Sequence, residues 1–159
     1  MGSSSTKRKS GQSDRQPQIN KVSPPQVSGT RGEPRKILVA DDKWENRHQL
    51  AKMLEPLGFE IFEAKNGKDA IKKTRSIKPD LILMDLVMPV MDGFEATRQI
   101  RRLTHLPHIV IIATSSSVFE LNRLQSANAG CDDFIPKPVQ AEMLLEKIEK
   151  YLKKEFMGG

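Results

Sequence analysis

The sequence predicts an α/β fold in which a doubly wound parallel sheet lies between two layers of helices. Short runs of β-forming residues alternate with helix-length segments that repeat apolar residues at the helical spacing, and five such strand–helix pairs follow one another. The runs are apolar at nearly every position, which is typical of strands that are buried on both faces of a sheet.

The first two strand–helix pairs have clear boundaries. The strand KILVA at 36–40 precedes a helix expected at 45–57, and Gly58 then supplies the left-handed residue that commonly ends a helix. The strand EIFEA at 60–64 precedes a helix expected at 67–77.

The third strand–helix pair contains a charged residue within a run of hydrophobic residues that would otherwise be expected in the core. The apolar run at 81–84 stops at Asp85, and hydrophobic residues then resume. A lone buried carboxylate is costly because desolvation opposes its ionised form, so we expect Asp85 at an open strand end. The strand is therefore expected at 81–85 and the helix at 93–103, with Asp92 as its N-cap.

The last two pairs complete the alternation. The strand HIVIIA at 108–113 precedes a helix expected at 118–129, which Gly130 ends. The strand CDDFI at 131–135 precedes a helix expected at 140–153.

Polar side chains gather at the ends of these strands. Asp41 and Asp42 follow the first strand, Asp85 closes the third, Ser115 follows the fourth after Thr114, and Lys137 follows the fifth. The carboxyl ends of parallel strands share one edge, and ligands of such folds bind in the crevice outside that edge. We therefore expect these side chains to form one site.

The residue types at this edge favour phosphoryl chemistry. Three carboxylates repel one another unless a cation joins them, and oxygen ligands without His or Cys favour Mg²⁺ over zinc. A carboxylate can attack phosphorus to give an aspartyl-phosphate, while Lys137 supplies positive charge and Ser115 a hydroxyl donor. Taken separately, each feature also has a structural explanation. Asp41 and Asp42 could cap a helix, the residues after Asp85 could simply form a turn, and Lys137 could be an exposed loop residue. Their coincidence at matching strand ends favours a site.

The segment 36–155 resembles the receiver domain of two-component response regulators. The matching pieces are ILVADD, DLILMDLVMPVMDG, IIATSS and FIPKP. Their separations also fit: 43 residues from Asp42 to Asp85, 30 from there to Ser115, and 22 from there to Lys137. The resemblance implies a flavodoxin-like five-stranded sheet in the order 2-1-3-4-5, in a (βα)5 three-layer sandwich.

The resemblance also implies a role for each matching residue. Asp85 would accept a phosphoryl group from a phosphohistidine of a histidine kinase or phosphotransfer protein, in a self-catalysed, Mg²⁺-dependent reaction that is later reversed by dephosphorylation. The implied metal ligands are Asp42 directly, Asp41 mainly through water, Asp85, and the backbone carbonyl of Val87. The implied switch residues are Ser115 and Phe134, with Lys137 beside the phosphoryl group and preceding a cis peptide to Pro138.

A more local resemblance concerns the parent protein. The stretch Asn46 to Ala70 looks like receivers attached to hybrid histidine kinases, with the Pro-rich stretch before Arg35 as the linker from a kinase core. The alternative within the family is a stand-alone regulator that works by docking. The chain shows no DNA-binding domain, so we do not expect it to control transcription directly, and a weak homodimer stays open.

Two alternatives come from other classes of protein. An aspartyl-phosphate phosphatase would carry a second carboxylate two residues after Asp85, where Val87 stands. A flavodoxin-like nucleotide binder would carry a Gly-rich phosphate loop, and neither G-x-G-x-x-G nor the P-loop pattern occurs.

Composition sets the domain limits and the compartment. Of the net charge of +6, residues 1–35 contribute +5 from seven basic and two acidic residues, so the basic character belongs to this segment. We expect a disordered Pro/Ser/Gly-rich linker at 1–34, the domain at 35–155 and a short tail at 156–159. The single cysteine, Cys131, excludes an internal disulfide, and the apolar runs are too short for a membrane span, so we expect a cytoplasmic setting.

Overall fold

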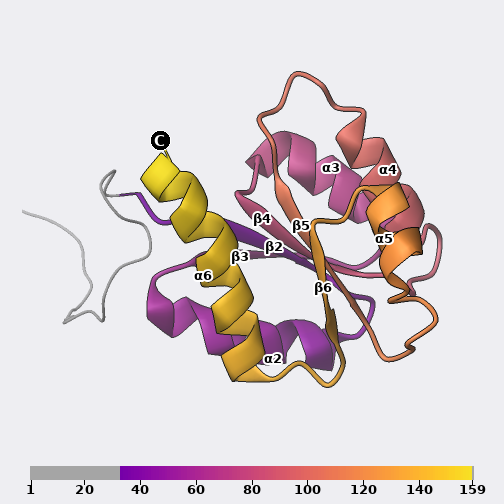
Figure 1. Cartoon of the computed structure of the whole chain (residues 1–159), viewed down its shortest axis with the longest axis horizontal. Helices are drawn as coiled ribbons and strands as arrows, with labels where there is room; N and C mark the ends of the chain where they lie inside the picture. The colour runs from indigo at the N-terminus through magenta and orange to yellow at the C-terminus, as the bar shows by residue number, and fades with distance from the viewer. Residues whose placement is uncertain (1–32, 159) are drawn as a thin grey trace, which may run out of the picture.

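Five parallel strands form the central sheet of the computed structural model, which describes residues 33–158 (Figure 1). The sheet order is β3-β2-β4-β5-β6, which is 2-1-3-4-5 in chain order, so the predicted topology is confirmed. The strands are β2 (Lys36–Ala40), β3 (Glu60–Ala64), β4 (Leu81–Asp85), β5 (Val110–Ser115) and β6 (Asp133–Pro136). Most of the linker expected at 1–34 lies outside the described residues.

The helices cover both faces of this sheet. They are α2 (Trp44–Leu54), the 3-10 helix η2 (Glu55–Leu57), α3 (Gly67–Ile77), α4 (Gly93–Arg101), α5 (Arg123–Ala129) and α6 (Ala141–Gly158). Figure 1 shows α2 and α6 on one face, and α3, α4 and α5 on the other.

Alternate residues of each central strand supply the two cores. Ile37 and Val39 of β2 pack in the cluster that includes Leu50 of α2 and Leu144 of α6. Leu38 of β2 instead packs in the cluster that contains residues of α3 and α4. Every residue of β4 is buried, which agrees with the apolar run of its first four residues.

The fourth and fifth strands begin later than the sequence predicts. β5 begins at Val110, where its pairing with Leu81 of β4 starts, so exposed His108 lies outside the sheet and Ser115 is the last residue of the strand. β6 begins at Asp133 because the Asp132 side chain accepts hydrogen bonds from the backbone N–H of Ile111 and from Arg101.

Several helix boundaries also differ from the prediction, and α4 ends at Arg101 instead of at 103. Pro56 lacks the N–H that an α-helix needs, so α2 ends at Leu54 and continues as η2. The helix expected from 118 begins at Arg123, because Asn122 acts as its N-cap and accepts a hydrogen bond from Gln125 N. α6 extends beyond 153 to Gly158, into the segment that the sequence assigns to a tail.

The predicted helix ends at glycine are confirmed. Gly58 and Gly130 have φ angles of 100° and 111°, a conformation that glycine adopts without steric cost. Asp92 caps α4 by accepting a hydrogen bond from Glu95 N, also as predicted.

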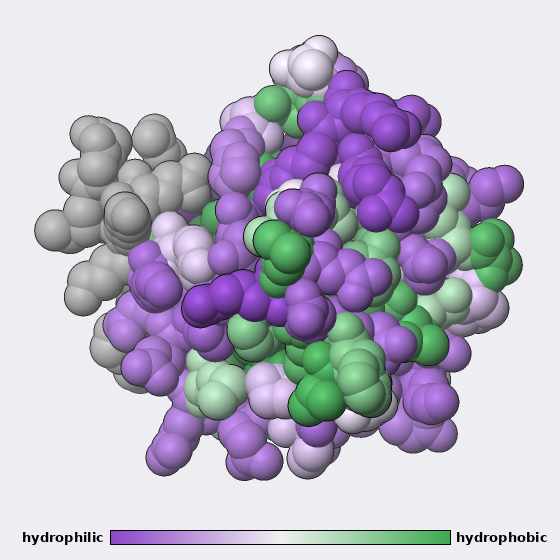
Figure 2. Space-filling view, turned by 45° about the vertical axis from the view of Figure 1, so that its right-hand side comes forward, coloured by the Kyte–Doolittle hydropathy of each residue, from purple (hydrophilic) through white to green (hydrophobic). Residues whose placement is uncertain are grey.

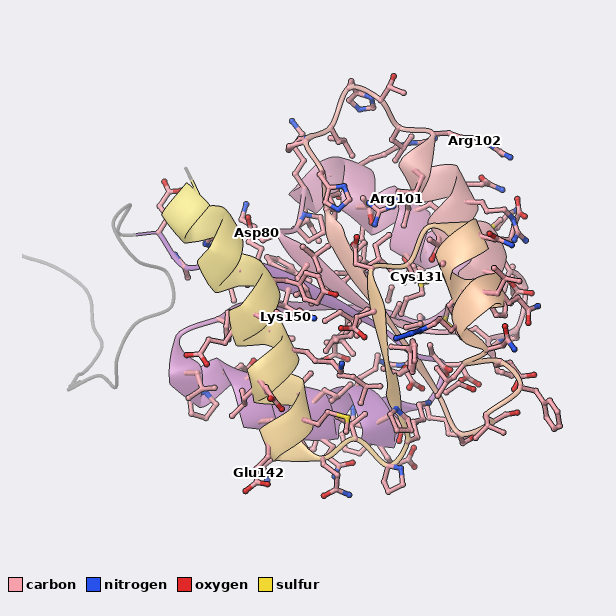
Figure 3. The ribbon with its side chains drawn as sticks, in the orientation of Figure 1. Asp80, Arg101, Arg102, Cys131, Glu142 and Lys150 are labelled. Carbon is pink, nitrogen blue, oxygen red and sulfur yellow. The ribbon has the colours of Figure 1, made fainter. Side chains whose placement is uncertain are left out.

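Arg101 ties α4 to the start of β6 (Figure 3). Its guanidinium donates to the carbonyl oxygens of Gly130 and Ile109 and to the Asp132 carboxylate, at 2.6–2.9 Å. Figure 2 shows a surface that is mainly hydrophilic, with a group of hydrophobic side chains in the lower half of the face shown and others near its centre and right edge. Among the described residues, no helix is long and apolar enough to cross a membrane.

Candidate functional site

The fold brings the predicted polar residues to one edge of the sheet. Asp41 follows β2, Asp85 ends β4, Ser115 ends β5 and Lys137 follows β6, so each lies at the carboxyl end of its strand. Register keeps the strand ends level, since Asp85 pairs with Thr114 and Ser115 pairs with Pro136.

Asp85 is buried and has two partners of opposite kinds. Its Oδ1 accepts a hydrogen bond from the backbone N–H of Val87 at 3.1 Å, and its Oδ2 lies 3.2 Å from Lys137 Nζ. Burial raises the pKa of the Asp85 carboxyl above its ordinary value, while the Lys137 charge and the Val87 hydrogen bond oppose the shift. Asp85 is thus a carboxylate deprived of water but oriented by fixed donors.

Lys137 joins two of the carboxylates. Its Nζ donates to Asp41 Oδ2 at 2.8 Å as well as to Asp85 Oδ2. Partial burial lowers the pKa of Lys137, but the hydrogen bonds and charges of Asp41 and Asp85 outweigh this effect, so the net shift is upward. The ammonium group therefore stays charged, and the peptide that follows it, Lys137–Pro138, is cis.

Asp41 is held from several sides. Its Oδ1 accepts a hydrogen bond from Lys43 N at 2.9 Å, and Asn46 Nδ2 lies 3.2 Å from both carboxylate oxygens. Buried Arg47 donates to the Asp41 carbonyl oxygen at 2.8 Å and pairs with Glu63 at 2.7 Å. Both carboxylate oxygens of Asp41 therefore already accept hydrogen bonds from protein donors.

Asp42 differs from Asp41 in both exposure and contacts. It is exposed, and its side chain makes no hydrogen bond or ion pair to any described residue. One oxygen each from Asp41, Asp42 and Asp85 lies within 4.8 Å of the others. Three carboxylates at this spacing, with no His or Cys among them, match the oxygen ligands that Mg²⁺ prefers.

The loop after Asp85 is folded tightly against the site. The side chain of Val87 is exposed, while its N–H binds Asp85. Gly93 N donates to the carbonyl oxygen of Leu86 at 3.1 Å, and a Cβ at Gly93 would collide with the carbonyl oxygen of Asp85. The glycine is therefore required for α4 to begin directly beside Asp85.

The two predicted switch residues lie on β5 and β6. Ser115 is buried, and its Oγ accepts a hydrogen bond from Ser117 N at 3.1 Å. Phe134 is half-buried and packs against the small core cluster that contains Phe94 and Leu121. Ser116, which follows Ser115 in the chain, is exposed.

Sequence reasoning missed the supporting roles of Asn46 and Arg47. Their motif served only as a mark of resemblance, whereas the structure shows that both hold Asp41 in place. Two polar residues in the first turn of the helix that follows a strand could have indicated that they hold the carboxylate at the strand end.

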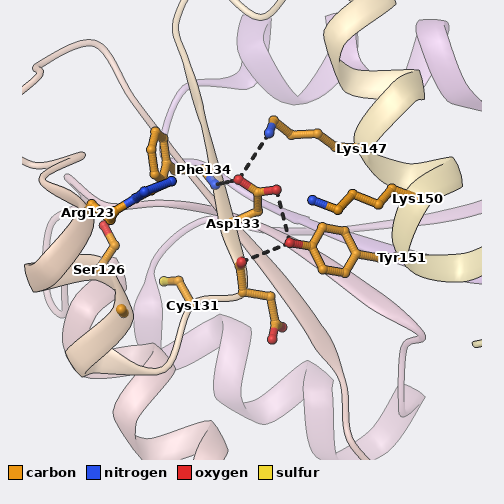
Figure 4. Close-up of a pocket in the computed structure, with 10 residues that line it drawn as sticks. Arg123, Ser126, Cys131, Asp133, Phe134, Lys147, Lys150 and Tyr151 are labelled. Carbon is orange, nitrogen blue, oxygen red and sulfur yellow. Dashed lines mark hydrogen bonds and ion pairs between the residues drawn. The ribbon is translucent and has the colours of Figure 1, made fainter. Parts of the chain in front are cut away.

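Phe134 also lines a cavity of about 380 Å³ between α5, β6 and α6 (Figure 4). Here Asp133 Oδ1 lies 3.1 Å from Lys147 Nζ, and Tyr151 Oη donates to Asp133 Oδ2 and to the Asp132 carbonyl oxygen, both at 3.0 Å. Asp85 does not line this cavity, so the two sites are separate.

We predict an unusually high pKa for Tyr151, the only tyrosine of the chain. Burial and the neighbouring Asp133 carboxylate raise the pKa of its phenol to about 12. The raised pKa favours the neutral phenol in the folded protein. The contribution of Tyr151 to the free energy of unfolding is therefore fully present below the unfolded pKa of about 10, and it is lost as the pH rises toward 12. Absorbance titration of the tyrosinate checks the value, and Asp133→Asn is expected to shift the midpoint down. A wild-type midpoint near the ordinary value would contradict the prediction.

The family model of the response regulator receiver domain matches residues 37–149. The chain is 40% identical over 122 residues to hybrid signal transduction histidine kinase L of Dictyostelium discoideum, covering 73% of this chain but 7% of that kinase. It is 36% identical over 117 residues to protein PilH of Pseudomonas aeruginosa, covering 74% of this chain and 97% of PilH.

Solved structures show the same fold. A CheY-like receiver domain protein from Methanospirillum hungatei superimposes with a TM-score of 0.72 at 29% identity, covering 80% of this chain and 100% of that one. The complex of the Saccharomyces cerevisiae phosphotransfer protein Ypd1 with the receiver domain of Ssk1 gives a TM-score of 0.71 at 27% identity, covering 77% of this chain and 92% of the matched chain.

Proposed function

This chain belongs to the response regulator receiver family, and on that premise we propose that Asp85 accepts a phosphoryl group from a phosphohistidine. The observation that carries the proposal is the position of the Asp85 carboxylate, which shares Lys137 with Asp41 at the edge of the sheet. Members of the family work with histidine kinases or phosphotransfer proteins, which are the proposed donors.

The transfer exchanges one bond for another. An Asp85 Oδ attacks phosphorus and forms a P–O bond, while the P–N bond of the phosphohistidine breaks and its electron pair returns to the imidazole nitrogen. Lys137 lies where it can bind an oxygen of the transferred group, since its Nζ already lies 3.2 Å from Asp85 Oδ2. Such a reaction depends mainly on positioning and charge stabilisation, which the fixed donors supply.

The site residues fit a magnesium ion. We propose that Asp42 and Asp85 hold it directly together with the Val87 carbonyl, and that Asp41 acts through water because protein donors already occupy its oxygens. A bound Mg²⁺ would neutralise charge on the carboxylates and on the phosphoryl oxygens.

The parent protein is proposed to be a hybrid histidine kinase, with this domain as a receiver attached to its kinase core. The similarity to the Dictyostelium kinase favours this assignment. PilH, which is matched over 97% of its length, favours the alternative of a single-domain regulator. Purification of the parent protein from its natural source and measurement of its mass distinguishes the two.

Removal of the exposed carboxylate tests the magnesium site. Asp42→Ala is expected to weaken Mg²⁺ binding by at least about tenfold, because a direct ligand is lost, and to slow labelling by phosphoramidate to the same degree. The metal-free variant is expected to be as stable as wild type or more so, because one repelling charge is gone. Trp44 is the only tryptophan and opens α2 two residues after Asp42, so its fluorescence reports the Mg²⁺ titration.

A matched control separates the metal site from general charge. Glu60→Gln removes an exposed carboxylate at the opposite end of the sheet, where β3 begins, and is expected to leave the titration unchanged. An Asp42→Ala protein that binds Mg²⁺ as tightly as wild type would overturn the assignment of Asp42.

A further inference from the structure

The cavity between α5, β6 and α6 is lined by three cations and two carboxylates (Figure 4). Arg123 comes from α5, and Lys147 and Lys150 come from α6. The carboxylates, Asp132 and Asp133, lie at the start of β6, an edge strand that pairs with β5 alone. The cavity therefore lies over one edge of the sheet, between two helices that both supply positive charge.

Both carboxylates of the cavity are already paired with other groups of the protein. The Asp132 carboxylate lies 2.9 Å from the guanidinium of Arg101, which does not line the cavity. Asp133 Oδ1 lies 3.1 Å from Lys147 Nζ, and its Oδ2 accepts a hydrogen bond from Tyr151 Oη at 3.0 Å. Burial raises the pKa of Asp133, but hydrogen bonds from a backbone N–H, from Lys147 and from Tyr151 outweigh the burial, so the net shift is downward and the carboxylate stays charged.

Two cations of the cavity have no carboxylate partner. Arg123 is exposed, and its side chain makes no hydrogen bond or ion pair to any other described residue. Lys150 is also exposed, and its ammonium group lies 5.2 Å from the centroid of the Tyr151 ring, without an anionic partner among the described residues. Because a paired cation cancels each of the two carboxylates, Arg123 and Lys150 leave the cavity with a charge of +2.

The cavity also offers a hydroxyl donor and two aromatic rings. Ser126 is buried, and its Oγ lies 3.5 Å from the carbonyl oxygen of Glu120, which is longer than a well-formed hydrogen bond between a hydroxyl and an oxygen. Its proton is therefore available to a ligand. Phe134 and Tyr151 are half-buried and line the cavity, so the apolar part of a ligand can pack against their rings. Aromatic walls with a few convergent polar groups are typical of pockets that bind small molecules.

We infer that this cavity binds a small organic molecule that carries a dianionic group, as a phosphate monoester does at neutral pH. A dianion matches the charge that Arg123 and Lys150 leave uncompensated, and these two side chains approach the cavity from opposite sides in Figure 4. The planar guanidinium of Arg123 can bind two oxygens of such a group at once. The inference does not depend on the proposed function, because neither Asp85 nor Lys137 lines this cavity.

The probe for the test is phenyl phosphate, which joins a dianionic group to an aromatic ring. It is titrated into isotope-labelled protein without Mg²⁺, so that the carboxylates around Asp85 repel it, and amide NMR shifts are followed. Shifts are expected across residues 123–134 and 147–151, with saturation below about 10 mM. Benzenesulfonate has nearly the same shape but one negative charge, and it is expected to bind at least about fivefold more weakly.

Variants separate a defined site from general attraction to a basic protein. Arg123→Gln and Lys150→Gln are each expected to weaken binding of phenyl phosphate about fivefold, as for the loss of one exposed ion pair. Ser126→Ala removes no charge and is expected to weaken binding about threefold through the lost hydrogen bond. The matched control is Lys72→Gln, which removes an exposed lysine of α3 outside the cavity and is expected to leave the affinity unchanged.

Several results would overturn this inference. They are the absence of saturable shifts around the cavity up to about 10 mM phenyl phosphate, equal affinity for benzenesulfonate, or an affinity that Arg123→Gln and Lys150→Gln leave unchanged. Shifts confined to residues 41–42, 85–87 and 137 would also overturn it, because the probe would then bind beside Asp85. Circular dichroism of each variant confirms the fold, so that a weaker affinity reports the lost contact.

Discussion

Asp85→Asn is expected to abolish phosphorylation by both phosphoramidate and phosphohistidine donors. Asparagine keeps the shape of the side chain but has no anionic oxygen to attack phosphorus. The fold should persist, because the amide oxygen can still accept the hydrogen bond from Val87 N and Lys137 keeps its contact with Asp41. Intact-mass spectrometry after incubation with phosphoramidate and Mg²⁺ measures the effect, with circular dichroism to confirm folding.

The control for this variant is Glu60→Gln, which removes a carboxylate remote from the site and is expected to be labelled as wild type is. A folded Asp85→Asn protein that gains a phosphoryl group to the same extent would show that another residue is the acceptor. The other carboxylates of the cluster, Asp41 and Asp42, would then be the first candidates.

Ser115→Ala is expected to accept the phosphoryl group at Asp85 but to lose most of the conformational response. In the structure described here Ser115 Oγ accepts a hydrogen bond from Ser117 N, so its own proton is available for a phosphoryl oxygen on the neighbouring strand end. Hydrogen bonds to charged groups contribute about 1.5–3 kcal/mol, which biases a two-state equilibrium roughly 10- to 100-fold.

The proposed response passes from Ser115 to Phe134. Movement of Ser115 toward the phosphoryl group leaves space behind it, and half-buried Phe134 is expected to turn inward, because an unfilled void forfeits packing contacts. This would reshape the cavity that Phe134 shares with α5 and α6. Amide NMR shifts with and without beryllofluoride, a phosphoryl mimic, measure the change. Equal shifts across residues 116–150 in wild type and Ser115→Ala would contradict the mechanism.

Patterns that repeat along the chain predicted the bounds of the first three strands, whereas the strand order came from the resemblance to receiver domains. The runs at 36–40, 60–64 and 81–85 coincide with β2, β3 and β4, because hydrophobic burial on both faces leaves few other arrangements for such residues. The same reasoning misplaced the start of β5, since His108 and Ile109 look like strand residues but lie before the first pairing with β4. Pairing is a tertiary property that local sequence does not contain.

The sequence was sufficient to predict those residues of the candidate site that lie at the ends of strands. Asp41, Asp42, Asp85 and Lys137 meet because parallel strands end at the same edge. The positive φ angle of Val90, +71°, was not predictable, because the sequence around it indicates a turn without fixing its backbone angles.

The most direct test of the account identifies the phosphorylated residue chemically. Wild-type protein is labelled with phosphoramidate and Mg²⁺, treated with borohydride, which reduces an aspartyl-phosphate to homoserine, and digested for tandem mass spectrometry. We predict homoserine at position 85 alone, at a yield that falls to background when Mg²⁺ is chelated. Homoserine at position 41 or 42, or the absence of homoserine from a protein that has gained a phosphoryl group, would contradict the assignment of Asp85 as the acceptor.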